Sequence, residues 1–223
     1  MDRVPEPELM DEAEQARAYA EADFSEPNTL FLDLFRTHFT DLAEQGAALD
    51  LGCGPADISV RFAAEHPRWT VDAVDGAENM LVFARDAVVA AGLEDRVRPL
   101  QGFLPSAAFP RASYEAILCN SLLHHLNDPL DLWRTIMAAA APGAAVLVMD
   151  LLRPMNEREV DHLVATHAAD APLVLQRDFR CSLFAAYREQ EVRDQLNSLG
   201  LSNLSVSPVS DRHLAVAGRF LPG

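Results

Sequence analysis

The fold is decided by one stretch, Ala47-Ala48-Leu49-Asp50-Leu51-Gly52-Cys53-Gly54-Pro55-Ala56-Asp57-Ile58. A short apolar run ends at an acidic residue, passes through a glycine-rich turn and opens a helical pattern at Ile58. This order of strand, loop and helix is typical of the first half of a βαβ unit. Because Gly52 and Gly54 lack a Cβ, the backbone can turn tightly and approach a ligand closely. The start of the helix then presents free N–H groups to whatever lies over the loop.

The glycine loop departs from the dinucleotide fingerprint G-x-G-x-x-G, because Asp57 stands at the third glycine position. A pyrophosphate there would meet a repelling carboxylate. A ligand with an ammonium and a carboxylate suits the loop better, since Asp50 can face the positive group. Residues 49–54 resemble the first motif of class I S-adenosylmethionine (SAM) methyltransferases, D-x-G-x-G-x-G, with Ala56 at the last glycine position. The resemblance implies SAM as cofactor and S-adenosylhomocysteine as product.

Composition predicts a globular protein without a phosphate-backbone partner. The 223 residues suit one domain with some additions, and 49% apolar and 23% charged residues are ordinary values. The net charge of −16 argues against nucleic acid and against an acidic membrane surface, because both attract basic faces. The motif N-P-P-Y of amino-DNA methylases does not follow the fourth predicted strand, where residues 120–123 read Asn-Ser-Leu-Leu. We therefore expect a small-molecule methyl acceptor.

Cysteine usage and hydropathy predict a cytoplasmic protein. The three cysteines are odd in number and far apart, which favours a reducing compartment and no disulfide framework. No apolar run approaches the roughly 20 residues of a membrane span. The first residues are acidic and lack the apolar core of a signal peptide. The sequence leaves open whether the protein forms a homodimer.

We predict an α/β fold, a Rossmann-like, doubly wound and mostly parallel sheet preceded by a helical lid. Residues 1–45 hold two amphipathic runs, 6–24 and 30–36, with Pro27 ending the first, and residues 46–223 form the SAM-binding domain. The runs either lie over the ligand-bearing edge of the sheet or only pack against it. Strands are expected at 47–51, 70–74, 96–100, 113–119 and 145–150, the last after a turn at 142–143. Residues 171–187 lack a clear period. Two closing strands at 204–208 and 213–217 match the seven-stranded sheet of the family, with a C-terminal antiparallel hairpin.

Asp75 ends the second predicted strand about twenty residues after the glycine loop, where an acidic side chain can accept hydrogen bonds from ribose hydroxyls. The alternative is a carboxylate that only stabilises the start of the next helix. The family usually has an acidic residue for the adenine amino group after the third strand, and this chain has Gly102-Phe103 instead. The resemblance therefore implies a cofactor site made of Asp50, Gly52, Cys53, Gly54 and Asp57 around the methionine part, Asp75 and Gly76 at the ribose, Met80, Gly102 and Phe103 at the adenine, and Asn120 and Ser121 near the sulfonium.

Methyl transfer from a sulfonium is an in-line displacement that needs orientation and exclusion of water more than a catalytic side chain. A general base helps a hydroxyl or protonated nitrogen nucleophile, and histidine suits neutral pH. His124 and His125 follow the fourth strand, at the edge where α/β ligands bind. Either can instead bond the backbone or pack on the cofactor. Further candidates are Asp150 and Tyr19 for catalysis, and Arg153 and Arg180 for a carboxylate or phosphate on the acceptor.

A metal is not expected, because His162 and His167 are five residues apart and no acidic third ligand is spaced to join them. Two other functions compete with methyl transfer. An NAD-dependent oxidoreductase would also use a Rossmann sheet, but Asp57 and the C-terminal hairpin speak against it. A non-catalytic SAM-binding protein would keep the glycine loop without turnover, and the missing acidic residue at Phe103 would fit that.

Overall fold

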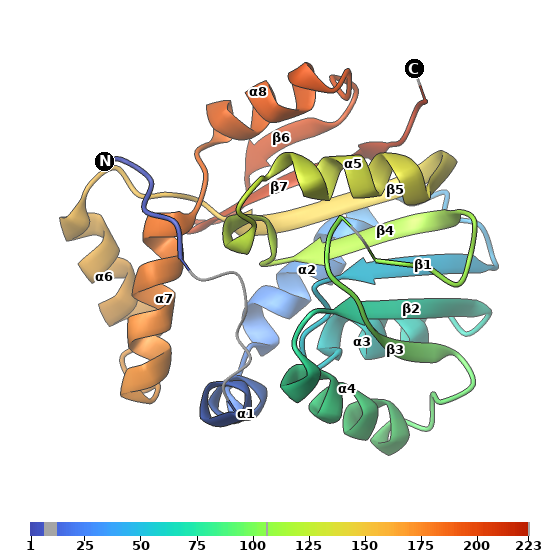
Figure 1. The fold of residues 1–223 in the computed structure, drawn as a ribbon, viewed down its shortest axis with the longest axis horizontal. Helices are drawn as coiled ribbons and strands as arrows, with labels where there is room; N and C mark the ends of the chain where they lie inside the picture. Colours follow the sequence, from blue (N-terminus) through green and yellow to red (C-terminus); the bar gives the residue numbers. More distant parts are fainter. Residues whose placement is uncertain (7–12, 106, 223) are drawn as a thin grey trace.

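The computed structural model describes residues 1–6, 13–105 and 107–222. Its centre is a seven-stranded sheet in the order β3-β2-β1-β4-β5-β7-β6 (Figure 1). The first five strands are parallel, and the last two form an antiparallel hairpin on β5. The strands are β1 (Gly46–Leu51), β2 (Trp69–Asp75), β3 (Val97–Gln101), β4 (Tyr114–Asn120), β5 (Ala140–Leu151), β6 (Ser205–Pro208) and β7 (His213–Arg219). The predicted doubly wound sheet with its closing hairpin is confirmed.

Helices cover both faces of the sheet, which explains why the central strands are apolar at nearly every position. One face packs on α5 (Leu130–Ala139) and α8 (Glu189–Ser198), and the other on α2 (Ser25–His38), α3 (Asp57–Glu65) and α4 (Glu78–Ala90). Alternate residues of one strand serve the two faces: Leu49 belongs to the first cluster and Ala48 to the second. The result is three layers with the sheet buried in the middle.

The register of the parallel strands brings their carboxyl ends to one edge. Asp50 of β1 lies opposite Ala73 of β2 and Leu118 of β4. The residues that follow these strands therefore emerge side by side, and Asp75 and Asn120 end the two strands that flank the glycine loop. This is the edge at which open α/β sheets bind ligands.

The N-terminal part of the chain contacts both the sheet and the far helices. Phe31 and Phe35 of α2 are buried in the same apolar cluster as α3 and α4, while α1 (Ala13–Glu21) lies against α4 and α7 (Leu173–Ala185). Residues 1–6 run along the end of α7, where the Val4 N–H donates to the Phe184 carbonyl at 3.0 Å. The predicted domain boundary at residue 45 stays a prediction. Residues 7–12 of the first predicted helix lie outside the described residues.

Three details differ from the sequence prediction. Pro27 lies in the first turn of α2 rather than ending the preceding helix, because a proline there has no N–H to lose. Residues 173–185 form the helix α7, which contacts α1, α6 (Glu157–His167) and the short turn η1 (Leu123–His125) and so lacks a single apolar stripe. β5 begins at Ala140 and passes through the expected turn, where Gly143 takes a φ of +82°.

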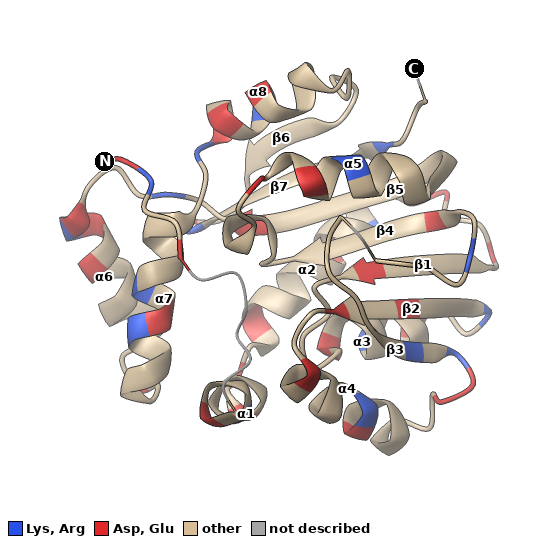
Figure 2. Ribbon diagram, in the orientation of Figure 1, with Lys and Arg blue, Asp and Glu red and all other residues tan. Residues whose placement is uncertain are grey.

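The start of α6 is fixed by a side-chain cap. Asn156 caps the helix, since its side chain accepts a hydrogen bond from the Glu159 N–H at 3.1 Å. Acidic and basic positions are mixed along the helices, as on α4, α6 and α8 (Figure 2). Within the part of the chain that the structure describes, no helix has the length and apolar character that crossing a membrane would require.

Candidate functional site

The glycine loop is held against β2 by its own backbone. The N–H groups of Gly52 and Cys53 both donate to the carbonyl of Val74, at 2.8 and 3.0 Å. Gly52 has a φ of +73°, and a Cβ on it would lie 2.9 Å from the Cβ of Leu122. Gly54 also has a positive φ, and nearly nothing would meet a Cβ there except the Tyr19 ring at 4.0 Å. Close packing against Leu122 therefore requires a glycine at position 52. The missing side chain of Gly54 leaves space above the loop that a ligand could fill.

Asp75 ties the glycine loop to the end of β2. Its carboxylate accepts hydrogen bonds from the N–H groups of Gly54 and Ala77, each at 2.8 Å, one on each oxygen. The contact with Gly54 was not foreseen. The predicted hydrogen bonds to a ribose stay a prediction.

Asp50 lies beneath the loop and is almost completely buried, with 2% of its surface exposed. The hydroxyl of Ser59, in α3, donates to its carboxylate at 2.5 Å. Burial raises the pKa of Asp50 to about 7; the Ser59 hydrogen bond opposes this rise and the nearby Asp75 charge adds to it. Ser59 was missed by the sequence reasoning. The only local signal was a polar side chain on the buried face of the helix that follows the loop.

A cavity of about 400 Å³ opens between the glycine loop and the helices α1 and α2. That volume is in the range of about 300–1,000 Å³ that is typical of small-molecule sites. Seven predicted site residues line it: Tyr19, Asp50, Gly52, Cys53, Gly54, Asp57 and Asn120. The loop that was predicted to hold the methionine part therefore shares one cavity with Tyr19 and Asn120.

The other predicted cofactor residues are not among those lining this cavity, namely Asp75, Gly76, Met80, Gly102, Phe103 and Ser121. Met80 is buried against Ala77 and Ala16 of α1, and 51% of the surface of Phe103 is exposed. Gly102 follows β3 and donates its N–H to the Asp75 carbonyl at 3.0 Å. The predicted adenine end therefore lies beyond the cavity in this structure.

Asn120 and Asn28 bridge the sheet edge to α2. The Asn120 amide nitrogen donates to the Asn28 side chain at 3.3 Å, and Asn28 in turn donates to Asp57 at 2.8 Å. The Asn120 Oδ1 atom is buried and has no hydrogen-bond partner among the described residues. A buried acceptor without a donor is costly, so this atom marks a place where a ligand donor would be stabilised.

Two acidic side chains that line the cavity, Tyr19 and Cys53, have raised pKa values. Burial, with a smaller effect of Asp75, raises the pKa of Tyr19 to about 12, and its ring lies 4.4 Å from that of Phe24. Burial also raises the pKa of the Cys53 thiol well above its usual range. Both shifts favour the protonated side chains near neutral pH. The catalytic role of Tyr19 stays a prediction.

A second polar cluster lies at the same edge, beyond Asn120. The Nδ1 atom of His124 is 2.5 Å from Asp150 Oδ1, and the Asp150 carboxylate also accepts from the N–H groups of His124 and Leu151. Burial alone would raise the pKa of Asp150, but the His124 imidazole outweighs it and lowers that pKa. Burial alone would lower the pKa of His124, but Asp150 and then Glu6 raise it. The two side chains form a buried charge-stabilised pair.

Glu6 closes this cluster from the N-terminal segment. Its Oε1 atom lies 3.3 Å from His124 Nε2 and 3.2 Å from His125 Nδ1, and the Ser182 hydroxyl donates to the same carboxylate at 3.0 Å. Neither histidine is among the residues that line the cavity. A base role for His124 stays a prediction, and it would require Glu6 to leave Nε2. No local signal pointed to Glu6, because it meets the histidines only through the fold.

The two predicted acceptor-binding arginines are engaged within the protein. Arg153 is buried and donates to the Ala186 carbonyl at 3.1 Å and to Glu191 at 2.6 Å. Arg180, on α7, is half exposed and donates to Asp161 at 3.2 Å. Their role toward an acceptor stays a prediction.

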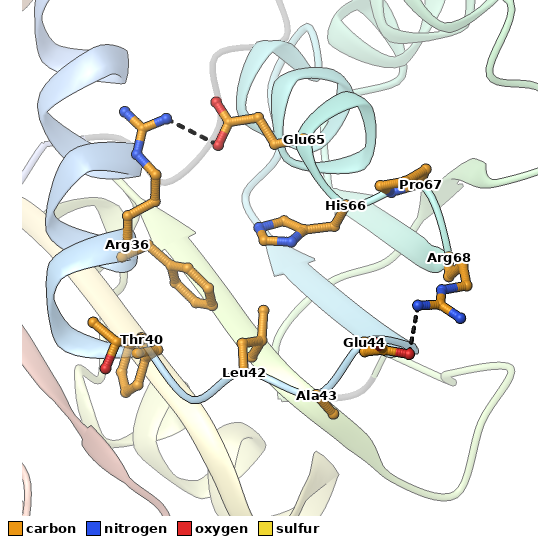
Figure 3. Close-up of a pocket in the computed structure, with 11 residues that line it drawn as sticks. Arg36, Thr40, Leu42, Ala43, Glu44, Glu65, His66, Pro67 and Arg68 are labelled. Atoms are coloured by element: carbon orange, nitrogen blue, oxygen red, sulfur yellow. Dashed lines mark hydrogen bonds and ion pairs between the residues drawn. The ribbon is translucent and has the colours of Figure 1, made fainter.

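A cavity of about 380 Å³ lies at the opposite end of β1, between the ends of α2 and α3 (Figure 3). Two ion pairs border it, Arg36 with Glu65 at 3.1 Å and Arg68 with Glu44 at 2.5 Å. These side chains are largely exposed and already paired. The cavity is remote from the carboxyl ends of the strands and shares no lining residue with the cavity at the glycine loop.

Comparison with known proteins identifies the domain. The family model described as a methyltransferase domain matches residues 49–146. Trans-aconitate 2-methyltransferase of Variovorax paradoxus is 31% identical over 132 residues, which are 59% of this chain and 48% of the relative. Demethylmenaquinone methyltransferase of Bacillus cytotoxicus is 27% identical over 115 residues, 51% of this chain and 48% of the relative. The chain thus spans about half the length of these curated relatives.

Solved structures agree on the fold. A SAM-dependent methyltransferase from Aquifex aeolicus superposes with a TM-score of 0.63 at 18% identity, covering 93% of this chain and 98% of the other. The plantazolicin methyltransferase BpumL, solved in complex with S-adenosylhomocysteine, gives 0.68 at 13% identity, with 92% and 91% covered. Motif, sequence relatives and fold point the same way: residues 49–146 match a methyltransferase domain, and the chain has the fold of SAM-dependent methyltransferases.

Proposed function

We propose that the protein binds SAM over the glycine loop and catalyses methyl transfer to a small-molecule acceptor. The observation that carries the proposal is the cavity of about 400 Å³ that joins this loop, Asp50 and the Asn120 Oδ1 atom, which has no hydrogen-bond partner in the described part of the chain. When bound there, SAM would supply a methyl group already activated on a sulfonium.

The cavity fits the amino-acid part of SAM. Asp50 and Asn120 offer acceptor oxygens to an ammonium group, and Asn120 Oδ1 lacks a donor among the described residues. Because burial raises the pKa of Asp50 to about 7, an adjacent positive charge would stabilise its ionised form and lower that pKa again. We infer that the Asp50 carboxylate and the Asn120 amide hold the ammonium end.

The ribose and adenine would extend from the loop toward the ends of β2 and β3. Asp75 ends β2 beside the glycine loop, and Gly76 follows it directly, so we propose these two residues as the ribose neighbours. Met80, Gly102 and Phe103 are the proposed adenine neighbours. Phe103 has the exposure that stacking on an adenine would remove. Ser121 and Asn120 would border the sulfonium.

The chain's own contribution to the reaction is orientation and exclusion of water. Tyr19 and Phe24 shield the loop from one side, and Tyr19 stays protonated because its pKa is about 12. We propose that residues 1–45 act as the lid of the site. Holding the reacting atoms in line is worth up to about 7–11 kcal/mol in well-oriented systems, so we propose orientation as the main contribution of the chain to the reaction.

The acceptor is proposed to be a small organic molecule. The two relatives described above are named for trans-aconitate and for demethylmenaquinone, both small molecules. The net charge of −16 opposes a nucleic-acid acceptor.

Calorimetry with SAM and S-adenosylhomocysteine tests the proposal. The parent protein should bind both, and Asp75→Ala should weaken binding by about 1–3 kcal/mol, because a charged hydrogen-bond acceptor and a loop anchor are lost. Glu44→Gln, in the opposite cavity, should leave binding unchanged and serves as the matched control. Folded parent protein that binds neither ligand would contradict the proposal, and NAD would be tested next.

A further inference from the structure

Three potential ligand atoms converge where the N-terminal segment crosses the end of β4. One potential ligand atom from each of Glu6, His124 and His125 lies within 4.8 Å of the other two. The Nε2 atom of His124 and the Nδ1 atom of His125 are 3.3 and 3.2 Å from Glu6 Oε1. Tetrahedral ligands bonded at about 2.0–2.1 Å to Zn²⁺ lie about 3.3–3.4 Å apart. The distances from Glu6 to both histidines therefore match those between ligands of one metal ion.

We propose that Glu6, His124 and His125 bind a divalent transition-metal ion, for which Zn²⁺ is the representative. Two imidazole nitrogens with one carboxylate oxygen suit Zn²⁺, Fe²⁺ or Co²⁺, whereas Mg²⁺ and Ca²⁺ prefer oxygen ligands alone. Three protein ligands leave a fourth position for water or an acceptor atom.

The ligands are oriented by side chains behind them. Asp150 holds the Nδ1 atom of His124 at 2.5 Å, which leaves Nε2 to face Glu6. A carboxylate behind a histidine is the arrangement that fixes the ring in most histidine–metal sites. The Ser182 hydroxyl, from α7, orients Glu6 in the same way. The cluster is thus prepared for a metal and needs no large rearrangement.

The charge of the cluster also favours a cation. The side chains of Asp150 and Glu6 are 3% and 10% exposed, so two carboxylates share a nearly buried place. Arg3 lies beside them and donates to the His124 carbonyl at 2.9 Å. A divalent ion would compensate the carboxylates where solvent does not. A proton on His124 is the other way to balance this charge, so the experiment has to separate the two.

A metal here would join distant parts of the chain. Glu6 comes from the N-terminal segment, while the histidines follow β4 next to Asn120 of the proposed SAM site. Binding would fasten residues 1–6 onto the sheet edge. It would also use the Nε2 atom that a general base needs, so the metal role and the base role of His124 exclude each other. The inference does not depend on SAM binding.

The test uses the full chain without a polyhistidine tag, stripped with a chelator and titrated with Zn²⁺. We expect one equivalent to bind per chain and to remain after dialysis, as read by elemental analysis. Co²⁺ in its place should give the visible absorption of a four-coordinate site, which a protonated cluster does not produce.

Single substitutions test each proposed ligand with little risk of unfolding the protein. Glu6→Gln and His125→Gln should each weaken Zn²⁺ binding by at least about tenfold, and the positioning variant Asp150→Asn by about 10–100-fold. His162→Gln changes an exposed histidine of α6 and should bind like the parent. Binding of S-adenosylhomocysteine and circular dichroism report the fold and the SAM site separately. Stripped parent that takes up no Zn²⁺, or variants that all bind like the parent, would overturn the inference.

Discussion

The glycine loop and the histidine cluster lie at the same edge of the sheet and are built in opposite ways. The loop, with Asp50 and Ser59, comes from one short stretch of chain and is fastened by Asp75 of the next strand. The cluster joins Glu6 of the N-terminal segment to the end of β4 and to Asp150 of β5. A motif formed by neighbouring residues can be recognised in the sequence, whereas a cluster of residues from distant parts of the chain cannot.

The pKa of a buried carboxylate also differs between the two regions. Asp50 and Asp150 are each 2% exposed, yet the pKa of Asp50 is raised to about 7 and that of Asp150 is lowered. The difference lies in the partner, because Asp50 receives a neutral hydroxyl and Asp150 faces an imidazole. Burial disfavours the ionised form of a carboxylate, and a positively charged partner can restore it.

The largest effect should come from breaking the charged pair. Asp150→Ala removes the partner of a buried imidazole and of two backbone N–H groups, and should lower the free energy of unfolding by about 3–5 kcal/mol. Urea unfolding followed by circular dichroism measures it. Asp50→Asn, which keeps an acceptor for Ser59, should cost clearly less. Equal losses of unfolding free energy in the two variants would show that the partner of the buried carboxylate makes no difference to stability.

A smaller loss tests the packing of the glycine loop. Gly52→Ala and Gly92→Ala share a positive φ, of +73° and +66°, but only at Gly52 would the new Cβ meet Leu122, at 2.9 Å. Both variants carry the backbone cost of about 1–2 kcal/mol, and the clash should add about 1–3 kcal/mol to Gly52→Ala. The midpoints of urea unfolding compare them. A Gly92→Ala variant as unstable as Gly52→Ala would show that φ alone matters.

The pH dependence of stability separates two buried groups with opposite signs. The pKa of Asp50 rises from its ordinary value of 3.8 to about 7 on folding, so between these values the folded protein keeps a proton that the unfolded chain releases. The free energy of unfolding then falls with rising pH, by up to about 1.4 kcal/mol per pH unit. Burial and Arg212 lower the pKa of His213 from 6.5 to about 4, so here the unfolded chain holds the extra proton and stability rises with pH.

These two contributions oppose each other in the parent, and single variants should reveal them. Between about pH 5 and pH 6.5, Asp50→Asn should make the free energy of unfolding increase more steeply with pH than in the parent. His213→Gln should make it decrease instead. Urea unfolding at both pH values provides the measurement. Identical slopes in the parent and the Asp50 variant would mean that Asp50 is ionised throughout this range.

The smallest effect concerns the bridge between α2 and the loop. Asn28→Ala removes the hydrogen bonds to Asp57 and Asn120, and should lower stability by only about 0.5–1.5 kcal/mol, because the bridge is partly exposed to water. It should also weaken the binding of S-adenosylhomocysteine slightly, as calorimetry can measure. A loss as large as that of Asp75→Ala would make α2 as important as the loop itself.

The sequence alone determined the parts that depend on neighbours along the chain. The strand–loop–helix at residues 47–58, the positions of the strands along the chain and the place of Asp75 after β2 follow from periodicity and glycine placement. Together with the resemblance of the glycine loop to class I methyltransferases, these features predicted the fold.

Only the tertiary structure decided which side chains meet and how they are charged. α7 lacks a period because several neighbours bury it, Ser59 reaches Asp50 beneath the loop, and Glu6 meets His124 and His125 across the fold. The opposite pKa directions of Asp50 and Asp150 have the same origin. Burial and long-range contacts are properties of the packed chain, and no local pattern of residues encodes them.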